Sequence, residues 1–187
     1  MARRVDGGKQ WFTRANDFGF SKKALETLRI WDKREVLSDV VAAIRYWQPD
    51  IIINRFPSDT TVQTHGHHTA SAILSLEAFD LTNDASSIPE SAAKYGVWQA
   101  KRIYFNTSYF FYKSQAEFEK ADKSTLANLE IGDYYPILGK SNNEISAESR
   151  SMHKCQAFGS IGNRNEQKEY LELLKGQQTA NKDDIFE

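Results

Sequence analysis

Residues 51–59, Ile-Ile-Ile-Asn-Arg-Phe-Pro-Ser-Asp, decide the fold, and residues 60–68, Thr-Thr-Val-Gln-Thr-His-Gly-His-His, follow them directly. Three consecutive isoleucines predict a short strand buried on both faces, as in the interior of a parallel sheet. An alanine-rich helix is expected over residues 69–80, with Thr64 as its N-cap. A strand, a polar loop and a helix start are where an open α/β sheet places its ligand site.

Residues 33–48 carry the clearest helical pattern of the chain. Their apolar members recur at three- and four-residue steps and form a single stripe, made of Val36, Leu37, Val40, Val41, Ile44 and Trp47. Charged residues of this segment, Arg45 among them, fall largely away from that stripe. Pro49 ends the helix and the isoleucine strand begins at once, which is the αβ half of a βαβ unit. Residues 102–106 predict a further strand by their β-propensity.

Composition excludes several classes of protein. The 187 residues carry 24 basic and 25 acidic side chains, a formal charge of −1, which argues against a nucleic-acid surface. The single cysteine, Cys155, forms no internal disulfide and requires no oxidising compartment. No signal peptide or membrane-spanning run is present in the sequence, and these features leave the localisation open.

Three of the four histidines lie within four residues, at positions 65, 67 and 68. On a helix, His65 and His68 share one face. Two interpretations of this spacing remain open. Paired imidazoles are a recurrent zinc motif, and clustered histidines at a helix start also occur as solvated surface residues.

The combination of Asn54-Arg55-Phe56-Pro57, Asp59 and His65-Gly66-His67-His68 resembles the second signature of the PIG-L/LmbE-like deacetylases, in particular the large bacterial members. These enzymes hydrolyse N-acetyl groups from glucosamine-containing substrates and use zinc. Their signature is usually His-Pro-Asp-His, so the resemblance implies that His68 binds the metal and that His65 assists catalysis. Gly66 and His67 depart from the pattern and remove the aspartate that normally supports the first histidine. Asp59, or another group, is expected to orient His65 instead.

The resemblance also implies substrate contacts. Arg55 lies within the matched signature, and the stretch Arg-x-x-Asp-Phe-Gly-Phe over residues 14–20 is similar to one near the family's pocket. Arg14, Asp17 and Arg55 are therefore candidate substrate-binding residues. The alternative, that Arg14 and Asp17 pair with each other at the surface, stays open. We expect a strand over residues 10–18 and a helix over 22–28 capped by Ser21.

A late helix is expected from the capping-box pattern that begins at Ser141, and it should run toward Gln156. The segment Met152-His153-Lys154-Cys155-Gln156 is similar to the family's histidine followed by Ser-Gln, with Cys155 in place of serine. The resemblance therefore places His153 and Gln156 on the pocket floor, as substrate-binding candidates. A lone histidine on a helix is more often structural. Residues 166–174 predict a last short helix.

The expected fold is α/β, a Rossmann-like, mostly parallel sheet flanked by helices. Residues 1–175 form the deacetylase-like domain, and the polar tail 176–187 is expected to fray. The family's first signature, His-Pro-Asp-Asp-Glu, does not occur in this sequence. In the family it supplies two metal ligands and the general base, so we expect an amino-terminally incomplete domain with half of its metal shell missing.

The sequence thus predicts a zinc-dependent N-deacetylase of N-acetylated amino sugars or glycoconjugates, inactive or impaired as a fragment and holding zinc weakly or not at all. The alternative is a non-catalytic carbohydrate-binding or scaffolding domain that kept the fold. Neither interpretation requires nucleic acid or a membrane span. Loss of a neighbouring strand would uncover a sheet edge, so self-association is also expected.

Overall fold

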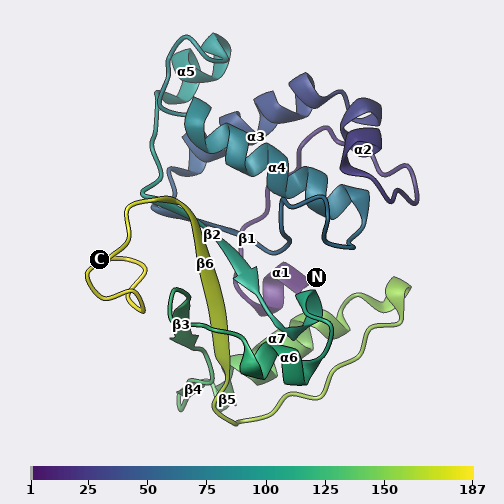
Figure 1. The fold of residues 1–187 in the computed structure, drawn as a ribbon, viewed down its shortest axis with the longest axis vertical. Helices are drawn as coiled ribbons and strands as arrows, with labels where there is room; N and C mark the ends of the chain where they lie inside the picture. The colour runs from purple at the N-terminus through teal and green to yellow at the C-terminus, as the bar shows by residue number, and fades with distance from the viewer. Residues whose placement is uncertain (1) are drawn as a thin grey trace. The chain divides into compact units, whose positions relative to one another are not determined.

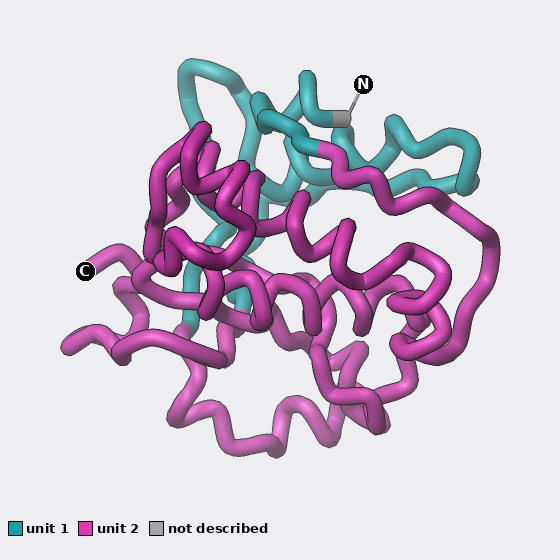
Figure 2. Tube along the Cα trace, turned by 90° about the horizontal axis from the view of Figure 1, so that it is seen from above, with its two compact units in different colours: residues 1–11, 128–169 teal, residues 12–127, 170–187 magenta. Residues whose placement is uncertain are grey.

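The computed structural model describes residues 2–187, which form two compact units (Figure 2). Unit 1 contains the chain up to Trp11 together with Asn128–Glu169, and unit 2 contains Phe12–Ala127 together with Tyr170–Glu187. Within the described residues, no helix combines the length and the apolar character that crossing a membrane requires.

The elements follow the order in which they appear along the chain in Figure 1. The helices are α1 (Ala2–Val5), α2 (Ala24–Ile30), α3 (Lys33–Trp47), α4 (Gly66–Leu81), α5 (Pro89–Tyr95), α6 (Gln115–Lys120) and α7 (Asn142–Ser151), with short 3₁₀ turns η1 (Tyr109–Phe111) and η2 (Lys154–Gln156). The strands are β1 (Ile51–Asn54), β2 (Arg102–Thr107), β3 (Ala127–Glu130), β4 (Tyr134–Tyr135), β5 (Lys140–Ser141) and β6 (Lys168–Gly176). The predictions for α3, for the isoleucine strand and for the strand at residues 102–106 are confirmed.

The main sheet is mixed and has the strand order β1-β2-β6-β3. β1 and β2 are parallel, with Ile52 opposite Ile103, whereas β6 runs antiparallel to β2. The fold is therefore α/β with helices flanking the sheet, but the expectation of a mostly parallel sheet is wrong. The reason is residues 166–174, which do not form the predicted helix and instead contribute most of strand β6.

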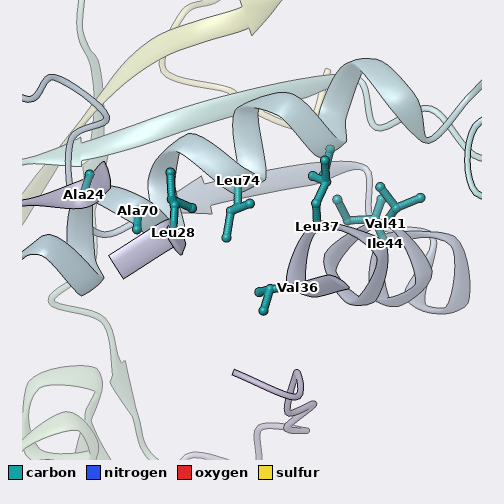
Figure 3. Packing of buried hydrophobic residues seen from close by; sticks show 9 residues of the cluster. Ala24, Leu28, Val36, Leu37, Val41, Ile44, Ala70 and Leu74 are labelled. Atoms are coloured by element: carbon teal, nitrogen blue, oxygen red, sulfur yellow. The ribbon is translucent and has the colours of Figure 1, made fainter. Parts of the chain in front are cut away.

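β1 is an outer strand of this sheet and has β2 as its only neighbour among the described strands. Its Ile53 side chain is 51% exposed, so the prediction of a strand buried on both faces is wrong for one face. Ile52 points the other way and packs against the helical core. The core lies between α2, α3 and α4, where Val41, Leu74 and Ala70 are almost fully buried (Figure 3).

Arg45 of α3 is the largest fully buried side chain of the chain's described part, at 1% exposure. Its guanidinium donates to the backbone oxygens of Leu81, Thr82, Asp84, Ser87 and Ile88 and to Ser91 Oγ, at 2.6–3.2 Å. A guanidinium has five N–H donors, so it is saturated here. The sequence pattern predicted an outward-facing charge, whereas the structure uses Arg45 to hold the α4–α5 connection.

Two local predictions near the amino-terminal end of unit 2 are wrong. Residues 10–18 form no strand, because no neighbouring strand pairs with them in the described chain. Ser21 does not cap α2, which begins at Ala24 with Lys23 in the N-cap position and no side-chain cap bond. The Ser21 hydroxyl instead donates to Glu26, with Oγ and Oε2 2.7 Å apart.

One prediction in the carboxy-terminal third is also corrected. The Ser141 capping box is confirmed, but α7 ends at Ser151, so His153 and Gln156 do not lie on it. The tail beyond Gly176 packs against the start of β2. Arg102 donates to the backbone oxygens of Gln177, Ile185 and Glu187, and Ile185 is buried.

Candidate functional site

The loop after β1 delivers the histidines to the first turn of α4. α4 begins at Gly66, and His65 rather than Thr64 occupies the N-cap position with an extended backbone. The Thr64 hydroxyl is engaged elsewhere, because its Oγ1 lies 2.6 Å from Thr69 Oγ1. The Thr64 side chain therefore contacts a side chain of the first turn, and the prediction that Thr64 is the N-cap is wrong.

His65 and His68 lie together, as their i, i+3 spacing predicts. Their ring centroids are 5.1 Å apart and the rings are within 18° of parallel. Phe56 stacks on the other face of His68, with centroids 3.7 Å apart, and the Phe20 ring meets His65 edge-on at 5.0 Å. Burial lowers the pKa of His68 below its ordinary value, and the neighbouring His65 and His67 rings lower it further. His68 is therefore neutral at pH 7, the form in which an imidazole binds a metal.

His67 does not join this stack. Its ring packs against Phe18, with centroids 4.4 Å apart, and against the edge of Trp31 at 5.4 Å. Its Nε2 is buried and has no hydrogen-bond partner in the part of the chain that the structure describes. Trp31 is itself fixed, because its Nε1 donates to the backbone oxygen of Asn16 at 2.9 Å. His67 thus joins α4 to the loop that precedes α2.

Gly66 allows this loop to approach the start of α4. The Gly66 N–H donates to the backbone oxygen of Ser21 at 2.8 Å. A Cβ atom at Gly66 would lie 2.6 Å from both the Lys23 backbone oxygen and Ser21 Oγ, closer than real Cβ contacts. The glycine that departs from the deacetylase signature is therefore required here by packing.

Asn54, the last residue of β1, presents a buried amide beside α4. The single hydroxyl proton of Ser75 faces two acceptors, Asn54 Oδ1 at 2.6 Å and the Ala72 backbone oxygen at 3.0 Å. If the proton goes to Ala72, Ser75 Oγ can accept from the Asn54 NH₂ group, with the amide turned over. In either orientation one buried polar atom of the amide has no partner, and Nδ2 is that atom as the amide is oriented.

A complete zinc shell is not found among the described residues. No three His, Cys, Asp or Glu side chains gather there in a way that could hold a metal ion. An imidazole binds zinc through a lone pair that lies in the plane of its ring. The His65 and His68 rings are stacked within 18° of parallel, so their lone pairs do not converge on one ion in this arrangement. His68 therefore offers a single ligand, and the described residues do not fit a catalytic zinc with three protein ligands.

Asp59 is held by a local turn. Its Oδ1 accepts from the backbone N–H and the hydroxyl of Thr61, both at 2.8 Å. These bonds, the backbone one first, lower the pKa of the Asp59 carboxyl. Asp59 is therefore ionised at neutral pH, and its described bonds go to Thr61 rather than to His65.

The three other candidates of unit 2 have different partners and make no hydrogen bond or ion pair to one another among the described residues. Arg14 pairs with Asp39, with Nη2 and Oδ1 2.7 Å apart, and with Glu35, so the alternative of an Arg14–Asp17 pair is wrong. Asp17 accepts from the Gly19 N–H at 3.2 Å. Arg55 donates to the backbone oxygen of Asn106 at 3.1 Å and lies over the Phe111 ring.

His153 and Gln156 belong to unit 1. His153 immediately precedes η2, its Nδ1 lies 3.2 Å from the Arg150 backbone oxygen, and its ring faces Phe158 edge-on. Gln156 is exposed at the end of η2. Within unit 1 neither side chain is part of a histidine or carboxylate cluster that could hold a metal.

A cleft of about 360 Å³ opens where the loop after β1 meets β2 and β6, and we call it the β2–β6 cleft. It is lined by Pro57, Ser58, Asp59, Val62, Phe105, Thr107, Phe111, Tyr112, Glu172 and Leu174. Phe111 also contacts Phe56, the ring that stacks on His68, with centroids 6.2 Å apart. The sequence did not indicate Thr107 or Glu172 as site residues. Glu172 could have been placed beside the cleft only if residues 168–176 had been recognised as a strand.

Comparison with protein-family models finds no match for this chain, and comparison with curated proteins finds none either.

Proposed function

We propose that this chain carries the histidine pair, His65 and His68, of a zinc-dependent N-deacetylase that acts on N-acetylated amino sugars or glycoconjugates. The observation that carries the proposal is the stacked pair His65 and His68 at the start of α4, directly after the loop that leaves β1. The parallel pair β1–β2, covered by α3 and α4, supports a Rossmann-like core of the LmbE type. The antiparallel strand β6 departs from a fully parallel arrangement.

His68 is the proposed metal ligand. Its ring is held flat against Phe56, and its lowered pKa keeps it neutral and ready to bind. Bound zinc lowers the pKa of a coordinated water to about 7 and so supplies a nucleophile. The described residues contain no group of three metal ligands, so they do not by themselves form a hydrolytic zinc site.

His65 is the proposed substrate-facing group. Its ring is exposed and lies on the outer side of the Phe56–His68 stack, where it can donate a hydrogen bond to a substrate oxygen. Asp59 remains our candidate for a general base. It would have to give up its bonds to Thr61 in order to act, and this makes it a weak base.

A second candidate function is carbohydrate binding without catalysis. The missing third ligand favours it, and so does the β2–β6 cleft, which has aromatic walls and a few polar groups. Clefts with those features and a volume of a few hundred Å³ are typical small-molecule sites. The two functions differ in whether zinc is needed.

The test is equilibrium dialysis of the chain against zinc, with bound metal measured by atomic spectroscopy and released acetate measured on N-acetylglucosamine. We expect weak zinc binding that His68→Ala abolishes and that His153→Ala, the matched control in unit 1, leaves unchanged. Acetate release should be negligible without a third ligand, and any turnover should disappear in His65→Ala. Tight stoichiometric zinc that survives His68→Ala would show that the proposed site is wrong. Sugar binding with zinc removed by a chelator and with no acetate would favour the second candidate.

A further inference from the structure

The β2–β6 cleft is negatively charged. Asp59 and Glu172 line it, and no Lys, Arg or His is among its described lining residues. The bonds from Thr61 keep the pKa of Asp59 low, so this carboxylate stays ionised at neutral pH. Carboxylates in a cleft with low-dielectric walls focus their field into the opening. The cleft therefore attracts cations and repels phosphates and other anions.

The lining of the cleft includes a hydroxyl that has no hydrogen-bond partner among the described residues. Thr107, at the end of β2, is 3% exposed and lines the cleft. None of the side-chain hydrogen bonds found among the described residues involves its hydroxyl. The Thr107 hydroxyl is thus available to a ligand that carries its own hydrogen-bonding groups.

The walls of the cleft are aromatic. The Phe105 and Phe111 rings meet edge-on, with centroids 5.0 Å apart, and Tyr112 lies beside them. Aromatic faces attract cations and pack against the apolar face of a ring. Arg55 lies over Phe111 at 5.9 Å, but its guanidinium donates to the Asn106 backbone oxygen and does not line the cleft.

We propose that the β2–β6 cleft binds a small hydroxylated ring that carries a protonated amine, the class to which an amino sugar with a free amino group belongs. The two carboxylates bind the ammonium group, the Thr107 hydroxyl bonds a ring hydroxyl, and Phe105 and Phe111 pack on the ring. A volume of about 360 Å³ suits one such ring. The requirement for a cation rests on the cleft alone, whereas naming the ring as an amino sugar rests on the proposed function.

The experiment is isothermal titration calorimetry of the chain at pH 7 with a chelator present, so that the outcome does not depend on zinc. Three probes are compared: glucosamine, N-acetylglucosamine and cyclohexylamine. Acetylation removes the charge, so glucosamine should bind about tenfold more tightly than N-acetylglucosamine. Cyclohexylamine should bind more weakly than glucosamine because it has no hydroxyl for Thr107. If cyclohexylamine binds as tightly as glucosamine, the amino-sugar assignment is wrong and the cation site stands.

Two variants locate the binding. Glu172→Gln keeps the shape of the side chain and should weaken glucosamine binding about tenfold, and Thr107→Val should weaken it about three- to tenfold. Glu119→Gln, an exposed carboxylate on α6 outside the cleft, is the matched control and should bind like the unmodified chain. Thermal melts of each variant confirm that it folds. Equal affinity for glucosamine and N-acetylglucosamine, no binding of any probe, or unchanged affinity in Glu172→Gln would overturn the proposal.

Discussion

Buried polar groups in two regions of unit 2 differ in whether they have hydrogen-bond partners. Around Arg45 every donor has an acceptor, supplied by the connection from α4 to α5. His67 Nε2 at the start of α4, and one atom of the Asn54 amide at the end of β1, are buried without a hydrogen-bond partner among the described residues. Satisfied buried groups rigidify a fold, whereas unsatisfied ones cost stability and are retained where something else uses them. Arg45 therefore belongs to the scaffold, whereas the start of α4 carries a polar group that the scaffold does not satisfy.

Removing Arg45 should have the largest effect. Arg45→Met leaves the backbone oxygens of the α4–α5 connection without their common donor and should lower the free energy of unfolding by about 3–5 kcal/mol. Urea denaturation measures the change. Arg34→Met, an exposed arginine on the same helix, is the matched control and should change stability by no more than about 0.5 kcal/mol. If Arg45→Met lowers the free energy of unfolding no more than Arg34→Met does, the bonds around Arg45 do not stabilise the fold as proposed.

At His67 a substitution is expected to raise the free energy of unfolding, the opposite of the effect at Arg45. His67→Phe keeps the ring between Phe18 and Trp31 and removes the unpartnered Nε2, so it should stabilise the chain by about 1 kcal/mol. His67→Ala loses the ring contacts as well and should destabilise the chain. Both are measured by the same urea denaturation. If His67→Phe proves as harmful as His67→Ala, Nε2 has a partner and the two regions are alike.

The smallest expected effect is a pH dependence. The pKa of His68 is lower in the folded chain than its ordinary value of 6.5, so the unfolded chain takes up a proton first as the pH falls. Stability should therefore be full above pH 6.5 and should decline as the pH falls below it. Thermal melts between pH 5 and 8 test this. His68→Phe, which keeps a ring against Phe56, should flatten the profile, and His153→Phe should not.

Local patterns in the sequence were enough for the elements that local interactions determine. The apolar stripe over residues 33–48 predicts α3, and the pattern from Ser141 to Glu144 predicts its capping box. The i, i+3 spacing of His65 and His68 predicts that they lie on one face, and in the structure their rings stack. Each of these depends only on neighbours within a few residues. The sequence alone therefore predicts that His65 and His68 lie close together.

Distant partners explain what the sequence did not predict. Apolar pairs at residues 170–171 and 173–174 suit a helix as well as a strand, and only pairing with β2, more than sixty residues earlier, selects β6. The acceptors that bury Arg45 are backbone oxygens, which carry no sequence signal. The β2–β6 cleft exists only because β2 and β6 pair, so Thr107 and Glu172 could not be recognised as site residues beforehand.

We propose that zinc binds at His68, beside His65. The most direct test is a zinc titration of the ¹⁵N-labelled chain, followed by NMR of the histidine ring nitrogens. The account predicts that zinc shifts the ring signals of His65 and His68 together and leaves those of His67 and His153 unchanged. Signals of His67 or His153 that move while those of His65 and His68 stay in place would contradict it.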